Sequence, residues 1–134
     1  MITWFEIPAF AFDESVDFYS KVFQINVEVK MLGSILYGIM NDKGQGITGA
    51  IMKVKEKLIP NQGPVLFFRV VDMSETLKRI AFYGGVVLKE KALIKNENPD
   101  GTLVIPRTYI DNAVGYYALF RDLEGNKMAL YSNS

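Results

Sequence analysis

The chain has 134 residues, of which 49% are apolar and 22% charged, with 15 basic and 15 acidic side chains and neither cysteine nor histidine. This length and composition predict one globular domain that needs no disulfide or metal to fold. The balanced charge, without a basic or acidic block, argues against nucleic-acid and anionic-membrane partners.

The missing residue types exclude whole classes of chemistry. Without cysteine there is no disulfide and no thiolate catalysis or ligation. Without histidine, the commonest metal ligand and the commonest acid–base catalyst at neutral pH are both absent. No apolar run is long enough to span a membrane and no targeting segment is recognised at the N-terminus, so a cytoplasmic protein is expected.

The first half of the chain is predicted to form a strand, a helix and three further strands, at residues 2–10, 12–24, 25–32, 34–41 and 46–54. Asp13 or Ser15 can cap the helix. The residues NDKGQG (41–46) are typical of a turn. Residues 55–64 are polar and contain two prolines, which predicts a linker.

The second half repeats this order, with a strand at 65–71, a helix at 72–85, a strand at 86–93 and a hairpin of strands at 116–122 and 127–132. The helical residues FDES (12–15) lie 61 positions before MSET (73–76), and YGIMND (37–42) lies 80 positions before YALFRD (117–122). The chain is therefore predicted to be a single domain of two similar modules, at about residues 1–54 and 65–132. Because neither module alone has enough core, we expect them to pack together.

Residues 94–115 have no counterpart in the first module. The segment is long and rich in turn residues, and long irregular segments in compact domains are usually lids, binding loops or disordered. We expect it to form a lid or rim over a binding site.

Several motifs together resemble the vicinal oxygen chelate superfamily, the group of glyoxalase, bleomycin-resistance and extradiol-dioxygenase proteins. WFEIP followed by FDESVDFYSKVF resembles the first strand and helix of these proteins, RDLEGNKMALYS resembles their closing hairpin, and the helix ending in YGG resembles the glycine stop of the second module. The resemblance implies an α+β fold in which two βαβββ modules form a curved mixed sheet around a cup.

In the metal-dependent members, the first and last strands of each module hold a divalent ion in the cup through histidine and glutamate. The resemblance places these positions at Trp4, Ala50, Leu66 and Ala129. None of these side chains can bind a metal. We therefore expect no metal and no cofactor, and no metal-dependent glyoxalase, dioxygenase or fosfomycin-transferase activity.

Strand alternation adds Glu6, Met52, Phe68 and Tyr131 to the expected cup. A largely apolar lining with one acid is typical of a small-molecule site. Two interpretations of the apolar residues stay open, because they could line an open pocket or fill a core. Glu6 likewise could serve the site, or form a structural ion pair with one of three arginines, Arg69, Arg107 or Arg121.

Two functional hypotheses follow, and binding is favoured because no second catalytic group is placed. In the first, the protein binds a small aromatic or cationic molecule between aromatic rings, with Glu6 as the counter-charge. In the second, it is a metal-independent enzyme, lyase- or isomerase-like, in which apolar surroundings make Glu6 basic enough to act as general base. A structural or partner-binding module is the third possibility. A homodimer is expected, because open curved sheets need cover for their edges and apolar faces.

Overall fold

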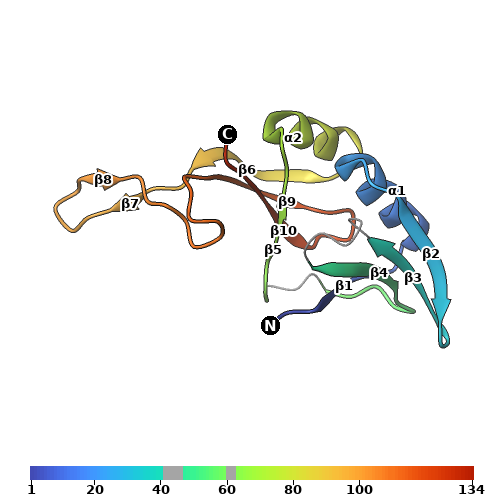
Figure 1. Cartoon of the computed structure of the whole chain (residues 1–134). Coiled ribbons are helices and arrows are strands. Elements are labelled where there is room, and N and C mark those ends of the chain that lie inside the picture. The colour runs from blue at the N-terminus through green and yellow to red at the C-terminus, as the bar shows by residue number, and fades with distance from the viewer. Residues whose placement is uncertain (41–46, 60–62) are drawn as a thin grey trace.

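The computed structural model describes residues 1–40, 47–59 and 63–134. The elements in chain order are β1 (Trp4–Ala9), α1 (Phe12–Phe23), β2 (Val27–Leu32), β3 (Ile35–Met40), β4 (Thr48–Lys53), β5 (Leu66–Arg69), α2 (Met73–Phe82), β6 (Val86–Leu93), β7 (Asn96–Glu97), β8 (Leu103–Val104), β9 (Tyr116–Arg121) and β10 (Lys127–Ser132) (Figure 1). The turn expected at 41–46 lies outside the described residues. The described part of the expected linker, 55–59 and 63–64, contains no helix or strand.

The two modules have the same strand order. The first sheet runs β1-β4-β3-β2 and the second β5-β10-β9-β6. In each sheet the first strand is parallel to the last strand of its module, and the other neighbours are antiparallel. This arrangement confirms the expected α+β fold of two βαβββ modules. In the described part of the chain the sheets are separate, with β1 and β5 each at an edge.

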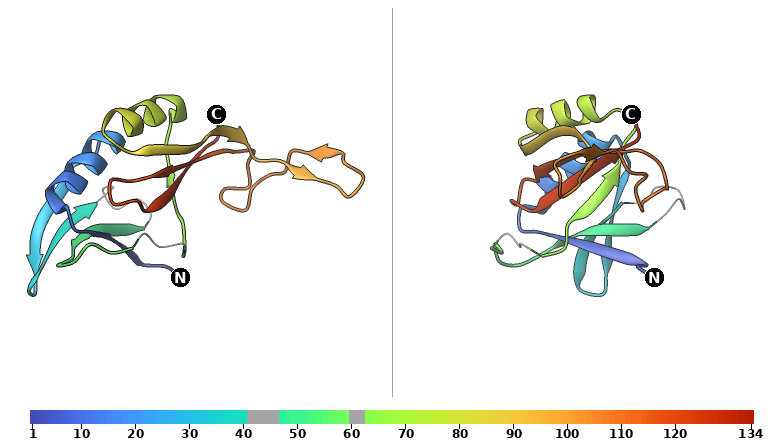
Figure 2. Two further views of the ribbon diagram at one scale, coloured as in Figure 1. Left: turned by 180° about the vertical axis from the view of Figure 1, so that it is seen from behind. Right: turned by 90° about the vertical axis from the view of Figure 1, so that its left-hand side faces the viewer.

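The two helices lie side by side and cover the sheets from one side (Figures 1 and 2). Each helix is amphipathic, so one face can be buried while the other stays in water. The core beneath them is formed by residues from both modules, among them Ile7, Tyr19, Ile51, Ile80, Phe120 and Leu130. In the described ranges, no helix has the length and apolar character needed to cross a membrane.

The start of α1 is held by the other module. Neither Asp13 nor Ser15 caps the helix, so that expectation is wrong. Instead, the Glu124 carboxylate in the β9–β10 turn accepts hydrogen bonds from the backbone N–H groups of Phe10 (2.6 Å) and Ala11 (3.3 Å). An acid at a helix N-terminus is favoured by the helix dipole and the unpaired N–H groups there.

Residues 94–115, which we call the arm, form a projection at β7 and β8 rather than a lid, while Ile110, later in the arm, lines the pocket described below. In the part of the chain that the structure describes, strands β7 and β8 pair with each other alone, and their hairpin extends away from the two sheets (Figures 1 and 2). The base of the arm is closed by a hydrogen bond from the Ile94 N–H to the Gly115 carbonyl, at 2.9 Å. A side chain at Gly115 would overlap the Tyr131 ring, so the returning chain passes close against β10.

Candidate functional site

The pairing of strands decides which predicted site residues share a face. Residues paired across neighbouring strands point to the same side of a sheet. In the first sheet Glu6 is opposite Ala50, so the four predicted residues of that module share one face: Trp4, Glu6, Ala50 and Met52. In the second sheet Ala129 is opposite Phe67, and Tyr131 is opposite Arg69.

The expected placement of Leu66 and Phe68 beside Ala129 and Tyr131 is therefore wrong. These two side chains point to the opposite face of β5 and pack against the core. The sequence already indicated which residues of β5 correspond to those of β1, because the two helices start 61 residues apart. An odd spacing makes even-numbered residues of β1 correspond to odd-numbered residues of β5. Phe67 replaces Leu66 beside Ala129, and a phenyl ring is no better a metal ligand than leucine.

Trp4 and Glu6 form a polar contact on the open face of the first sheet. The Trp4 indole N–H donates a hydrogen bond of 3.0 Å to Glu6 Oε2. Tyr37 of β3 lies on the same face, because its partner Met52 does. Partial desolvation raises the pKa of Tyr37, and so do the negative charge of Glu6 and a hydrogen bond between the two side chains. Trp4 and Glu6 are both exposed in the single chain. The apolar surroundings that were expected for Glu6 are therefore not found there.

The proposed ion pairs of Glu6 with arginine do not form. Arg69 pairs with Asp111 instead. Arg107 and Arg121 donate to backbone carbonyls near them in the sequence, at 3.1 and 2.8 Å. Glu6 instead accepts a hydrogen bond from Trp4 and lies near Tyr37.

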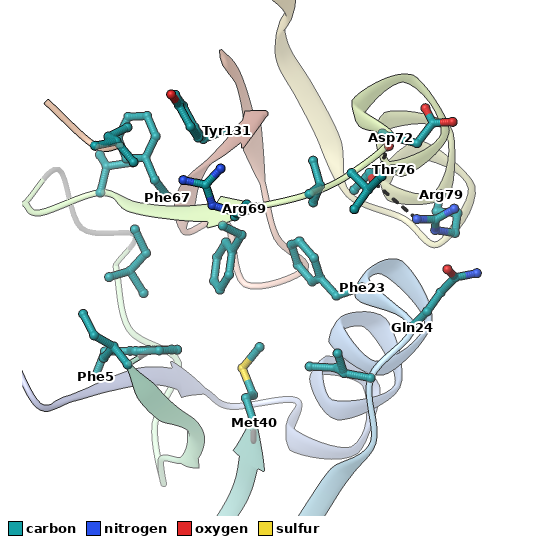
Figure 3. Close-up of a pocket in the computed structure, with 18 of the residues that line it drawn as sticks. Phe5, Phe23, Gln24, Met40, Phe67, Arg69, Asp72, Thr76, Arg79 and Tyr131 are labelled. Carbon is teal, nitrogen blue, oxygen red and sulfur yellow. Dashed lines mark hydrogen bonds between the residues drawn. The ribbon is translucent and has the colours of Figure 1, made fainter. Parts of the chain in front are cut away.

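A pocket of about 1130 Å³ opens between the first module and strand β5 (Figure 3). We call it the intermodule pocket. Side chains from both faces of β5 line it, since that strand has a free edge toward the first module. Of the eight predicted site residues, Leu66, Phe68 and Tyr131 line this pocket. The other five do not contribute to its wall: Trp4, Glu6, Ala50, Met52 and Ala129.

Aromatic rings from four elements line one part of the pocket. The ring of Phe68 lies 4.8 Å from that of Phe23 in α1 and 6.2 Å, edge-on, from that of Phe5 in β1. Phe67 and Tyr131 line the pocket on the other side of β5 (Figure 3). Sequence reasoning missed Phe5 and Phe23, because their proximity to Phe68 depends on how the modules pack. It missed Phe67 because the face of β5 was assigned one residue out of register.

The polar end of the pocket is one face of α2. Asp72, Glu75, Thr76 and Arg79 all line it. Their spacing of three, four and seven residues places them on one side of the helix, which explains why they face the pocket together.

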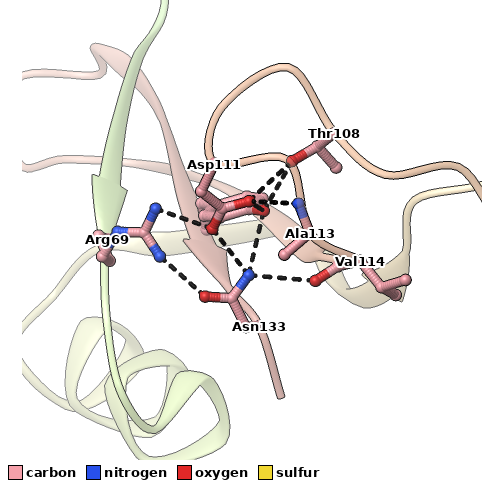
Figure 4. A network of polar contacts seen from close by, with 7 residues as sticks. Arg69, Thr108, Asp111, Ala113, Val114 and Asn133 are labelled. Atoms are coloured by element: carbon pink, nitrogen blue, oxygen red, sulfur yellow. Dashed lines mark hydrogen bonds and ion pairs between the residues drawn. The ribbon is translucent and has the colours of Figure 1, made fainter.

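Near Tyr131, the pocket is bordered by a polar network centred on Asp111 of the arm (Figure 4). Arg69 lies over the Tyr131 ring at 5.0 Å and pairs with Asp111 at 3.0 Å. The Asn133 amide also donates to Asp111, at 2.8 Å, and the Tyr131 hydroxyl does so at 2.8 Å. These hydrogen bonds hold the pKa of the Asp111 carboxyl well below its usual range, and the bond from Asn133 has the largest effect. The network fixes Tyr131 and the base of the arm in one position.

Within residues 1–40, 47–59 and 63–134, no three or more acidic side chains lie together in a way that could hold a metal ion.

Comparison with solved structures identifies proteins that have a similar fold. A glyoxalase/bleomycin resistance protein from Albidiferax ferrireducens T118 matches with a TM-score of 0.65 and 15% identity, covering 98% of each chain. A glyoxalase/bleomycin resistance protein/dioxygenase family enzyme from Burkholderia phytofirmans PsJN matches with a TM-score of 0.63 and 13% identity, also covering 98% of each chain. A hypothetical protein from S. aureus matches with a TM-score of 0.58 and 20% identity, over 98% of this chain and 96% of that one.

A scan against protein-family models and a search of curated proteins found no match. The resemblance stated from the sequence is confirmed at the level of the fold. The chain has the glyoxalase/bleomycin resistance fold.

Proposed function

We propose that the protein binds a small organic molecule with a flat apolar part in the intermodule pocket, without a metal ion. The observation that carries this proposal is the pocket itself, about 1130 Å³ with an aromatic wall. Ligand sites are typically concave, lined mostly by apolar and aromatic side chains, and supplied with a few polar groups for orientation. The polar groups here lie on α2 and around Arg69.

A metal-independent enzyme is the second candidate function. Its candidate site is the open face of the first sheet rather than the intermodule pocket. There the Glu6 carboxylate lies beside Tyr37 and accepts the Trp4 N–H, so a base and a phenol are close together. A general base works best when its surroundings make it a stronger base than in water. Because Glu6 is exposed, we favour binding over catalysis.

Thermal shift with a compound library tests the proposal, since a ligand that binds the folded state raises the melting temperature. Metal-free bleomycin is the first probe, because structural neighbours are described as bleomycin resistance proteins. Phe67→Ala removes a half-exposed ring from the pocket, and Phe82→Ala removes an exposed ring outside its lining. We expect the ligand-induced shift to be lost in Phe67→Ala and kept in Phe82→Ala. A library without any hit, or equal shifts in both variants, would contradict the proposal.

We also propose that two copies of the chain form a homodimer. The arm exposes Leu103, Val104 and Ile105, and a two-stranded hairpin is marginally stable by itself in water. A second copy would bury these side chains. Light scattering should give a mass of twice 15.1 kDa, reduced to 15.1 kDa by Val104→Asp but not by Phe82→Asp. A mass of 15.1 kDa for the unmodified chain at all micromolar concentrations would argue against the dimer.

A further inference from the structure

Among the described residues, one cation of the intermodule pocket, Arg79, has no acidic side chain paired with it. Arg79 of α2 is partly buried and lines the pocket. Its Nε–H donates to the Val22 carbonyl at 2.8 Å and its Nη2 donates to Thr76 Oγ1 at 3.2 Å. Both acceptors are neutral oxygens.

The acids nearest to Arg79 along α2 have other partners. The Asp72 carboxylate caps the helix by accepting the Glu75 N–H at 3.0 Å. The Glu75 carboxylate pairs with Lys78 at 3.2 Å. Within the described residues no carboxylate lies within ion-pair distance of Arg79. Arg69, the other arginine of the pocket, differs in this respect because Asp111 pairs with it at 3.0 Å.

The contacts of Arg79 leave it able to bind a ligand. A guanidinium carries five N–H donors, and the two hydrogen bonds use two of them. The bond to Val22 at the end of α1 and the bond to Thr76 in α2 anchor the side chain from both modules. A positively charged group near the C-terminal carbonyls of α1 is also favoured by that helix's dipole. The guanidinium is thus held in place without being neutralised.

We infer that the ligand carries a carboxylate or phosphate group, and that this group binds to Arg79. The inference rests on the proposed binding function and names the ligand class. A partly buried cation is stabilised by an ionic partner, and the planar guanidinium suits the paired oxygens of carboxylates and phosphates. Figure 3 shows Phe23 and Gln24 at the same end of the pocket as Arg79. An aromatic acid could therefore contact Arg79 with its anionic group and the Phe23–Phe68 wall with its ring. The ligand would then be anionic, in place of the cationic one expected from Glu6.

Matched pairs of an acid and its neutral amide test this inference. We would titrate 1-naphthylacetate against 1-naphthylacetamide, and indole-3-acetate against indole-3-acetamide, by calorimetry. The unmodified protein should bind each acid at least tenfold more tightly than its amide. The preference should disappear in Arg79→Gln and remain in Arg107→Gln, which changes an exposed arginine outside the pocket lining.

The outcomes separate the two proposals. Equal affinity for acid and amide, or an unchanged preference in Arg79→Gln, would overturn the inference and leave the binding proposal standing. Failure of all four compounds to bind would count against the binding proposal and the inference together. Should Arg79→Gln not fold, Arg79→Lys keeps the charge and should retain part of the preference. In the unmodified protein the preference for the acid over the amide should also weaken as the salt concentration is raised. A preference that changes neither in Arg79→Lys nor with salt would overturn the inference.

Discussion

The Tyr19 hydroxyl donates a hydrogen bond of 2.7 Å to Asp122 Oδ2 and so joins α1 of the first module to the β9–β10 turn of the second. Both residues are buried. The Tyr19 ring also lies near the rings of Phe23 and Phe68, at 6.0 and 6.2 Å between centroids. The hydrogen bond therefore fixes the two modules next to the aromatic wall of the pocket.

Removal of this hydrogen bond should destabilise the protein. Tyr19→Phe keeps the ring and leaves the buried Asp122 without one of its donors, which should lower the free energy of unfolding by about 1–3 kcal/mol. Tyr109→Phe is the matched control, because Tyr109 is exposed. Urea unfolding followed by circular dichroism measures both variants. Equal stability of the two would show that the Tyr19–Asp122 link adds little.

The burial of Asp122 should make stability depend on pH. Desolvation is the largest influence on this carboxyl and raises its pKa above the model-peptide value of 3.8, although four hydrogen bonds oppose the shift. The folded protein then holds a proton that the unfolded chain has released, so the contribution of Asp122 to stability falls as the pH rises from about 3.8 through the raised pKa of the folded state. In Asp122→Asn this contribution is absent. The stability difference between the unmodified protein and Asp122→Asn should therefore shrink with rising pH, and a constant difference would contradict the assignment.

Local patterns in the sequence predicted most of the fold. Apolar periodicity placed one helix at 12–24, and the structure has it at Phe12–Phe23. The strand expected at 86–93 is found at Val86–Leu93. Such elements are specified by residues close together in the chain, and the repeat of the pattern predicted two similar modules.

The site was harder to predict, because it depends on contacts between distant residues. Phe5 and Phe68 meet only after the modules pack, and Arg79 bonds to a carbonyl 57 residues away. No local pattern reports such contacts. The error at Leu66 is of another kind, since a shift of one residue moves a strand side chain to the other face of the sheet.

The contact between Trp4 and Glu6 provides a test of which face of the protein binds ligand. Neither residue lines the intermodule pocket. Glu6→Gln should therefore leave the affinity for the pocket's ligand unchanged, while Phe67→Ala weakens it. Loss of the negative charge should also lower the pKa of Tyr37, which Glu6 helps to raise. The difference in phenol absorbance between Glu6→Gln and Glu6→Gln/Tyr37→Phe follows the titration of Tyr37 without Glu6. The same difference between the unmodified protein and Tyr37→Phe follows it with Glu6 present. Weakened binding in Glu6→Gln would instead favour the open face of the first sheet as the site.

The Asp111 network should stabilise the arm only while Asp111 is ionised. Hydrogen bonds, of which the one from Asn133 has the largest effect, depress the pKa of this carboxyl far below 3.8. The contribution of Asp111 to stability is therefore present above about pH 3.8 and is lost as the pH falls below that value. The unmodified protein should be more stable than Asp111→Asn near neutral pH, and the difference should shrink on acidification. Amide exchange gives a local readout, because the Ala113 N–H donates to Asp111 at 3.1 Å and the Thr108 N–H donates to the Ala113 carbonyl at 2.8 Å. Both amides should exchange faster in Asp111→Asn. Unchanged exchange there would mean that the arm is held by its backbone contacts rather than by the carboxylate.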